Sequence, residues 1–112
     1  MSAANYDLVI DQGSTFAIDL TINESGSAKD LTGYSARAQM RSTKTSSTVA
    51  ASFTCTIVNA SNGTVKMELP ATTSSAMEAG MYFYDLEVHT GSDAIVKRLL
   101  EGKVTLNQEV TR

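Results

Sequence analysis

Residues 80–88 read Gly80-Met81-Tyr82-Phe83-Tyr84-Asp85-Leu86-Glu87-Val88. Side chains alternate between the two faces of a β-strand, so one face of this stretch carries Tyr82, Tyr84, Leu86 and Val88. The other face carries Asp85 and Glu87. We therefore predict that residues 80–88 form a central strand of a β-sandwich, with the tyrosine and aliphatic row turned toward the core.

The same period of two recurs along most of the chain. It predicts further strands near residues 6–10, 16–22, 34–40, 53–57, 65–69 and 95–106. The polar segment 23–30 is expected to close a hairpin, and Asn62-Gly63 suits a tight turn between two strands. Gly102 is expected to mark a bulge or a bend in the last strand.

A short crossing segment is expected after Pro70, which lacks an amide donor and so ends its strand. Residues 71–80 are long enough for one helical turn, with Met77 against the core. Tyr82 follows this segment, where immunoglobulin-like sandwiches place a tyrosine whose hydroxyl bonds back to the crossing backbone. The pattern predicts an all-β, immunoglobulin-like antiparallel sandwich of about seven to eight strands.

The length, composition and net charge of the chain limit the kinds of protein that it can be. At 112 residues with 42% hydrophobic content, the chain can build one core, and we predict a single β-sandwich domain over 1–112 with short polar terminal extensions. The net charge of −3 gives no electrostatic reason to bind nucleic acid. No apolar run reaches the eighteen or so residues of a membrane span, so no membrane insertion is expected. The start lacks the pattern of a signal peptide, which predicts folding in a cytoplasm.

Asp85, Glu87 and His89 share one face of the predicted strand. Successive positions on that face are about 7 Å apart, too wide for all three side chains to reach one metal ion without another strand. There is no second His, and the one Cys is distant in sequence. We interpret the three residues as part of a solvated outer face, and we predict no metal site and no cofactor.

Nucleophilic chemistry has weak candidates. Cys55 is the only cysteine, its neighbours on the same face are Phe53 and Ile57, and we interpret it as a buried, inert thiol. The sequence contains no Gly-x-Ser-x-Gly elbow and no phosphate-binding glycine loop. We therefore predict that the protein is not an enzyme and has no catalytic residues.

Two groups of residues have alternative interpretations. Arg37, Arg41 and Lys44 form a basic stretch that either binds an anionic partner or sugar, or blunts an exposed strand edge; we favour the structural alternative. Three tyrosines, at positions 34, 82 and 84, are candidates for a carbohydrate platform, but all fall on the predicted core face. Core packing with tethered hydroxyls is the prediction.

Four stretches carry a resemblance to a known family: residues 6–16, with their glutamine-glycine turn, and residues 30–41, 79–86 and 98–104. The chain resembles small tailed-bacteriophage virion proteins, and is similar to the immunoglobulin-like N-terminal module of baseplate upper proteins. The likeness covers almost the whole chain.

The resemblance implies a non-enzymatic structural component of a phage virion, a tail or baseplate adaptor or fibre-attachment protein that acts by protein–protein docking. Its partners would be other virion proteins, it would be a homo-oligomer or multi-copy, and it would be made in the host bacterial cytoplasm and located in the virion. A capsid decoration protein and a carbohydrate-binding module for host surface glycans are the alternatives. Loop 42–48 and the ends, 1–5 and 107–112, are expected to order on assembly.

Overall fold

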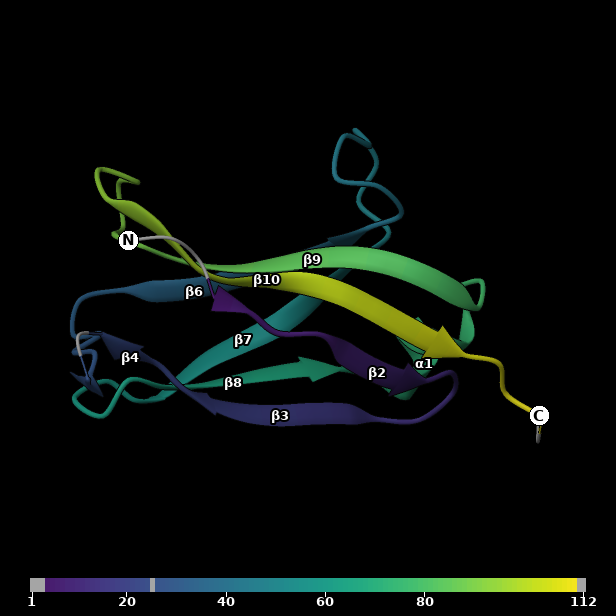
Figure 1. The fold of residues 1–112 in the computed structure, drawn as a ribbon, viewed down its shortest axis with the longest axis horizontal. Helices are drawn as coiled ribbons and strands as arrows, with labels where there is room; N and C mark the ends of the chain where they lie inside the picture. Colours follow the sequence, from purple (N-terminus) through teal and green to yellow (C-terminus); the bar gives the residue numbers. More distant parts are fainter. Residues whose placement is uncertain (1–3, 25, 111–112) are drawn as a thin grey trace.

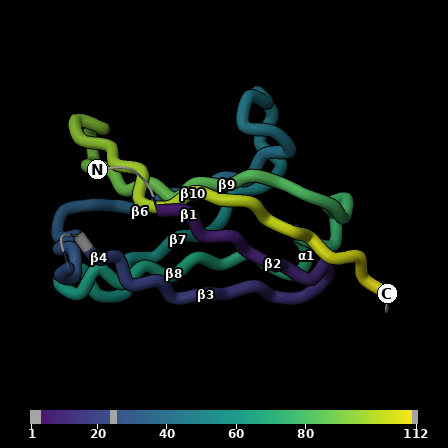
Figure 2. The backbone as a smooth tube through the Cα atoms, viewed as in Figure 1, coloured from purple at the N-terminus to yellow at the C-terminus, as the bar shows by residue number. Residues whose placement is uncertain are grey.

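Strands make up most of the computed structural model, which describes residues 4–24 and 26–110 (Figures 1 and 2). In chain order the elements are β1 (Ala4–Asn5), β2 (Leu8–Asp11), β3 (Phe16–Thr21), β4 (Asn23–Glu24), β5 (Ser27–Ala28), β6 (Ser35–Arg41), β7 (Ala51–Asn59), β8 (Thr64–Leu69), α1 (Ala71–Ser75), β9 (Gly80–His89) and β10 (Val96–Asn107). The predicted all-β class is therefore confirmed. The predicted first strand, residues 6–10, is only partly found: β2 covers its second half, and Tyr6 and Asp7 lie outside any strand, between β1 and β2.

Eight strands form one mixed sheet in the order β1-β10-β9-β6-β7-β8-β3, with β2 also paired to β10. The prediction of a purely antiparallel arrangement is wrong, because β1 and β2 both run parallel to β10. The sheet curls into a half-barrel in which β9 and β10 lie across from β3 and β8 (Figure 1). β7 allows this curl: its residues 51–53 pair with β6, whereas most of its remaining residues pair with β8.

The core lies inside the curl and follows the predicted alternation on β8 and β9. Tyr82, Tyr84, Leu86 and Val88 are buried on β9. Phe53 of β7 links the layers, with its ring centroid 6.2 Å from that of Tyr84 and 6.1 Å from that of Phe16 on β3. The inward rows of β3 are only half-buried, because β3 is the last strand of the sheet and has a neighbour on one side.

The crossing segment after Pro70 closes one end of the half-barrel, as predicted. Ser74 of α1 is fully buried, and its Oγ accepts a hydrogen bond of 3.0 Å from the amide of Gly13. Gln12 donates from Nε2 to the carbonyl of Met77 at 2.8 Å, and Met77 packs half-buried against the core. The glutamine-glycine turn thus fastens the crossing segment to the start of β3.

The two predicted hairpins have different outcomes. β7 and β8 pair antiparallel as predicted, and Gly63 adopts a positive φ of 68° in their turn. A hairpin closed by residues 23–30 is wrong, because β3 pairs with β8 and not with β6. Residues 23–30 instead contain a two-stranded sheet of their own, β4 with β5.

Gly102 does not mark the irregularity in β10. The bulge falls between Arg98 and Leu100, so Leu99 is the extra residue. Gly102 is required for a close approach, because a Cβ there would lie 2.8 Å from the carbonyl carbon of Tyr6. The chain entering β2 therefore crosses directly over this glycine.

The predicted polar extensions are partly built into the sheet. Ala4 and Asn5 already pair with β10, and Glu109 donates its amide to Gln12 Oε1 at 2.9 Å. Residues 1–3 and 111–112, also predicted to be terminal extensions, lie outside the described residues. No helix in residues 4–24 and 26–110 has the length and apolar character needed to cross a membrane.

Candidate functional site

The outward side of β6, β9 and β10 gathers the charged side chains that the sequence analysis singled out. Cross-strand pairing aligns these side chains in rows, and we call this surface the charged face. The row nearest the β9–β10 turn is Arg37–Glu87–Arg98. Farther from that turn follow Gln39–Asp85–Glu101 and then Arg41–Phe83–Lys103.

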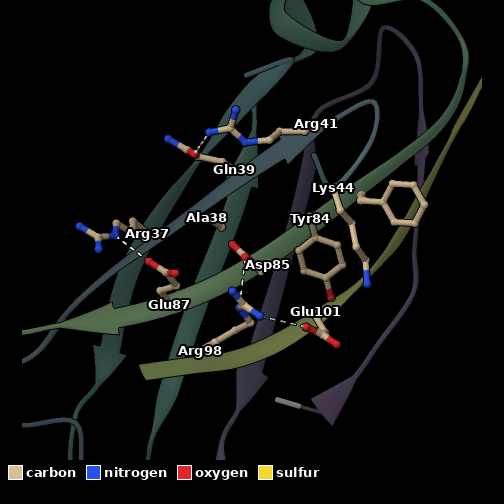
Figure 3. A pocket seen from close by; sticks show the side chains of 11 residues that line it. Arg37, Ala38, Gln39, Arg41, Lys44, Tyr84, Asp85, Glu87, Arg98 and Glu101 are labelled. Atoms are coloured by element: carbon tan, nitrogen blue, oxygen red, sulfur yellow. Dashed lines mark hydrogen bonds and ion pairs between the residues drawn. The ribbon is translucent and has the colours of Figure 1, made fainter. Parts of the chain in front are cut away.

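Arginines of the outer two strands hold the acidic side chains of the central strand (Figure 3). Arg37 Nε lies 3.0 Å from Glu87 Oε1. Arg98 Nε lies 3.2 Å from Asp85 Oδ2, and its Nη1 lies 3.4 Å from Glu101 Oε1. Each carboxylate of β9 thus has its own arginine, one from each neighbouring strand.

The pKa shifts in the two ion pairs have different main causes, burial for Asp85 and a hydrogen bond for Arg37. Burial raises the pKa of Asp85, and the nearby Glu87 carboxylate raises it further, whereas Arg98 opposes both effects. The hydrogen bond with Glu87 raises the pKa of Arg37. Exposed ion pairs of this kind contribute little each, about 0.2–1 kcal/mol, and mainly orient the side chains.

An open hollow of about 590 Å³ lies over the charged face. The loop between β6 and β7 and the turn between β9 and β10 both project on the side away from β3 and β8 (Figure 1). Each loop contributes a charged side chain that reaches toward the face. Lys44 Nζ lies 5.8 Å from the ring centroid of Phe83, and Asp93 Oδ2 lies 3.5 Å from Arg37 Nη1. Lys44 thus lines the hollow directly, whereas Asp93 contacts one of the residues that line it.

Asp85, Glu87 and His89 share the outer face as predicted, but they do not converge. His89 Nδ1 lies 3.2 Å from Asp93 Oδ1, while the two acids pair with different arginines. Within the described ranges, no three or more His, Cys, Asp and Glu side chains are placed to hold a metal ion.

Cys55 is half-buried on β7, and burial raises the pKa of its thiol from 9.0 to about 11. A thiol with such a pKa is protonated at neutral pH, so it lacks the thiolate that acts as a nucleophile. The sequence predicted a buried thiol, whereas the structure leaves this one only half-buried.

The tyrosines lie where the core-packing interpretation put them. Tyr82 and Tyr84 are 9% and 4% exposed, and Tyr34 is half-buried against the core. Tyr82 Oη donates to the carbonyl of Glu78 at 2.6 Å, as a tyrosine corner requires. Tyr84 Oη donates to the carbonyl of Tyr6. These rings do not form an exposed platform for sugars.

The edge-blunting interpretation of the basic stretch is wrong, because β6 lies between β9 and β7 in the sheet. Arg37 and Arg41 instead belong to the charged face. Sequence reasoning missed Phe83, Arg98 and Lys103 as members of this face. The inward positions predicted on β10 already indicated that Lys103 points outward, but nothing local indicated which strands would flank it.

No protein-family model matches the sequence, and no curated protein matches it. Among solved structures, the chain is similar to InlP of Listeria monocytogenes, with 19% identity and a TM-score of 0.50 over 94% of this chain and 28% of InlP. A family 123 glycoside hydrolase from Clostridium perfringens is 12% identical with a TM-score of 0.47, over 100% of this chain and 24% of the hydrolase. The likeness to InlP is one of fold, and the chain spans about a quarter of either protein.

Proposed function

We propose that this protein is a non-enzymatic structural component of a phage virion, a tail or baseplate adaptor or fibre-attachment protein that acts by protein–protein docking. The observation that carries the docking role is the charged face. Its hollow is open, and the carboxylates of its central strand form ion pairs with Arg37 and Arg98. Paired charges on an open surface suit recognition of another protein, because they set orientation and partner choice more than affinity.

The family resemblance supports the virion part of the proposal. The glutamine-glycine turn that contributes to the resemblance fastens β3 to the crossing segment through Gln12 and Gly13. Partners would be other virion proteins, and the chain would be present in many copies. Many simultaneous contacts would hold the assembly even where each is weak.

We further propose that the half-barrel is a variant of the immunoglobulin-like sandwich. In this description β10, β9 and β6 form one layer, β8 and β3 form the other, and β7 passes between them. The tyrosine corner made by Tyr82 supports this description. The parallel pairing of β2 with β10 departs from a purely antiparallel sandwich.

Immunogold labelling of phage particles with antibodies against the purified chain tests the virion role. Particles released by the bacterium that carries the gene are compared with particles from a strain in which the gene is deleted. Label on the tail or baseplate is the expected result. Label confined to the head would assign the chain to capsid decoration, and particles without label and without its peptides in mass spectrometry would overturn the proposal.

A further inference from the structure

Three cations of the charged face, Arg41, Lys44 and Lys103, lie in or beside the row that contains Phe83. Arg41 donates from Nη2 to Gln39 Oε1 at 3.1 Å and from Nη1 to the carbonyl of Ser46 at 2.9 Å. Lys44 Nζ approaches the Phe83 ring, and Lys103 is the residue of β10 that pairs with Phe83. Across residues 4–24 and 26–110, no carboxylate forms an ion pair with Arg41, Lys44 or Lys103.

An apolar row lies next to these cations on the same side of the sheet. Thr105 of β10 is paired with Val9 of β2 on one side and with Met81 of β9 on the other. Val9 is 64% exposed and Met81 is 53% exposed, although both are large and hydrophobic. The row is two residues along from Phe83 and Lys103, a distance of about 7 Å in a strand.

Together, the cations of one row and the exposed apolar side chains of the other indicate which kind of partner would bind here. The three cations form no ion pair within the described residues, so they can attract a negatively charged group, while exposed aliphatic side chains gain by contacting other apolar side chains. Two carboxylates lie nearby: the charge of Arg41 partly offsets the burial that raises the pKa of Asp85, and Asp7 Oδ1 accepts a hydrogen bond from the amide of Lys103. The remaining rows contrast with them, because Asp85 and Glu87 there are already matched by arginines. Arg41 and Lys103 are two strands apart, or about 10 Å, which an extended peptide covers in about three residues.

We propose that the Arg41–Phe83–Lys103 row and the adjacent Val9–Met81 row bind an extended acidic segment of a partner protein that also carries apolar side chains. The inference rests on the proposed docking function and deepens it by naming the partner's chemistry. A peptide fits better than an anionic glycan, because the exposed valine and methionine side chains gain by contacting other apolar side chains and offer a sugar no flat ring for stacking.

Fluorescence anisotropy with a synthetic peptide tests the inference. The probe is a labelled, end-blocked dodecapeptide that alternates Glu with Val and carries a central Pro against self-association, and a Gln-for-Glu version is the neutral control. The full chain is expected to bind the acidic peptide, to bind the neutral one at least tenfold more weakly, and to lose affinity as salt rises above ~0.15 M.

Matched variants assign the binding to the surface. Arg41→Gln and Lys103→Gln are each expected to weaken binding about threefold, and the double variant about tenfold. Lys66→Gln removes one positive charge from β8, on the other side of the half-barrel, and is expected to leave affinity unchanged within about 1.5-fold. Circular dichroism confirms that each surface variant remains folded.

Several outcomes would overturn the inference. These are no binding at millimolar peptide, equal binding of the neutral peptide, or an equal loss with Lys66→Gln. Binding of a sulfated oligosaccharide, lost in the Arg41→Gln and Lys103→Gln double variant while the peptide fails to bind, would assign the surface to an anionic glycan instead. If the double variant still enters virions as efficiently as the wild type, this inference fails while the proposed virion role stands.

Discussion

Removing one hydroxyl from each of two buried tyrosines should loosen two different parts of the molecule by similar amounts. Tyr84 Oη donates to the carbonyl of Tyr6, between β1 and β2. Tyr82 Oη donates to the carbonyl of Glu78, in the crossing segment. Substitution by Phe keeps the ring in the core and removes only the hydrogen-bond donor. The loss of local stability in each variant therefore shows which segment that hydroxyl stabilises.

The magnitude follows from where the two acceptors lie. Tyr6 is 43% exposed, Glu78 is exposed, and both hydrogen bonds are only partly buried, so we expect water to replace the hydroxyl at either carbonyl. The loss is then the net value of one hydrogen bond, about 1 kcal/mol for each variant. With an unfolding entropy of about 2.1 cal/mol/K per residue, the melting temperature of this chain should fall by roughly 4 °C.

Urea denaturation and native-state hydrogen exchange measure the two effects. Tyr84→Phe should speed exchange in β1 and β2 and leave residues 71–79 protected, while Tyr82→Phe should do the reverse. Each variant is the control for the other, because both lose the same group from the same strand. Unchanged stability in both, or faster exchange of the same segment in both, would refute the reasoning.

Three further predictions concern other parts of the fold. Gly102→Ala should lower the free energy of unfolding by about 2 kcal/mol in urea titrations, because its Cβ would lie 2.8 Å from the carbonyl carbon of Tyr6; an unchanged midpoint would contradict this. Burial raises the pKa of the Cys55 thiol from 9.0 to about 11, so the folded state favours the neutral thiol. That stability is full below pH 9 and should be lost as the pH rises toward 11, and urea midpoints measured across this range should fall less in Cys55→Ala than in the wild type. Arg98→Gln should cost about 0.5 kcal/mol at low salt, and the difference should shrink in ~1 M NaCl; a difference independent of salt would show that the ion pairs are not its source.

Much of the fold is predictable because alternation is a local property of the strand backbone. The row of Tyr82, Tyr84, Leu86 and Val88 is buried as its spacing predicts, and Asp85 with Glu87 faces outward. The tyrosine corner was predictable for the same reason, since the hydroxyl and its acceptor lie four residues apart in the chain. Alternation thus identified the candidate site residues on β9, but it did not identify the arginines that pair with them.

Arg98 shows why the partners were not predictable. It lies two residues before the buried Leu100, so strict alternation would place it inside. The extra residue Leu99 reverses its direction and brings it to Asp85. A bulge depends on how two distant segments pair, so the sequence of either segment alone does not predict it.

The sequence by itself determined which side chains face the core on β8 and β9, where most strands lie, and where the β7–β8 turn falls, because these follow from backbone periodicity and turn chemistry. Only the tertiary structure decided the strand order, the parallel pairing of β2 with β10, the double pairing of β7 and the rows of the charged face. Each of these depends on contacts between residues far apart in the chain. The free energy that stabilises these arrangements comes from packing the whole sheet around one core, and no single segment supplies it.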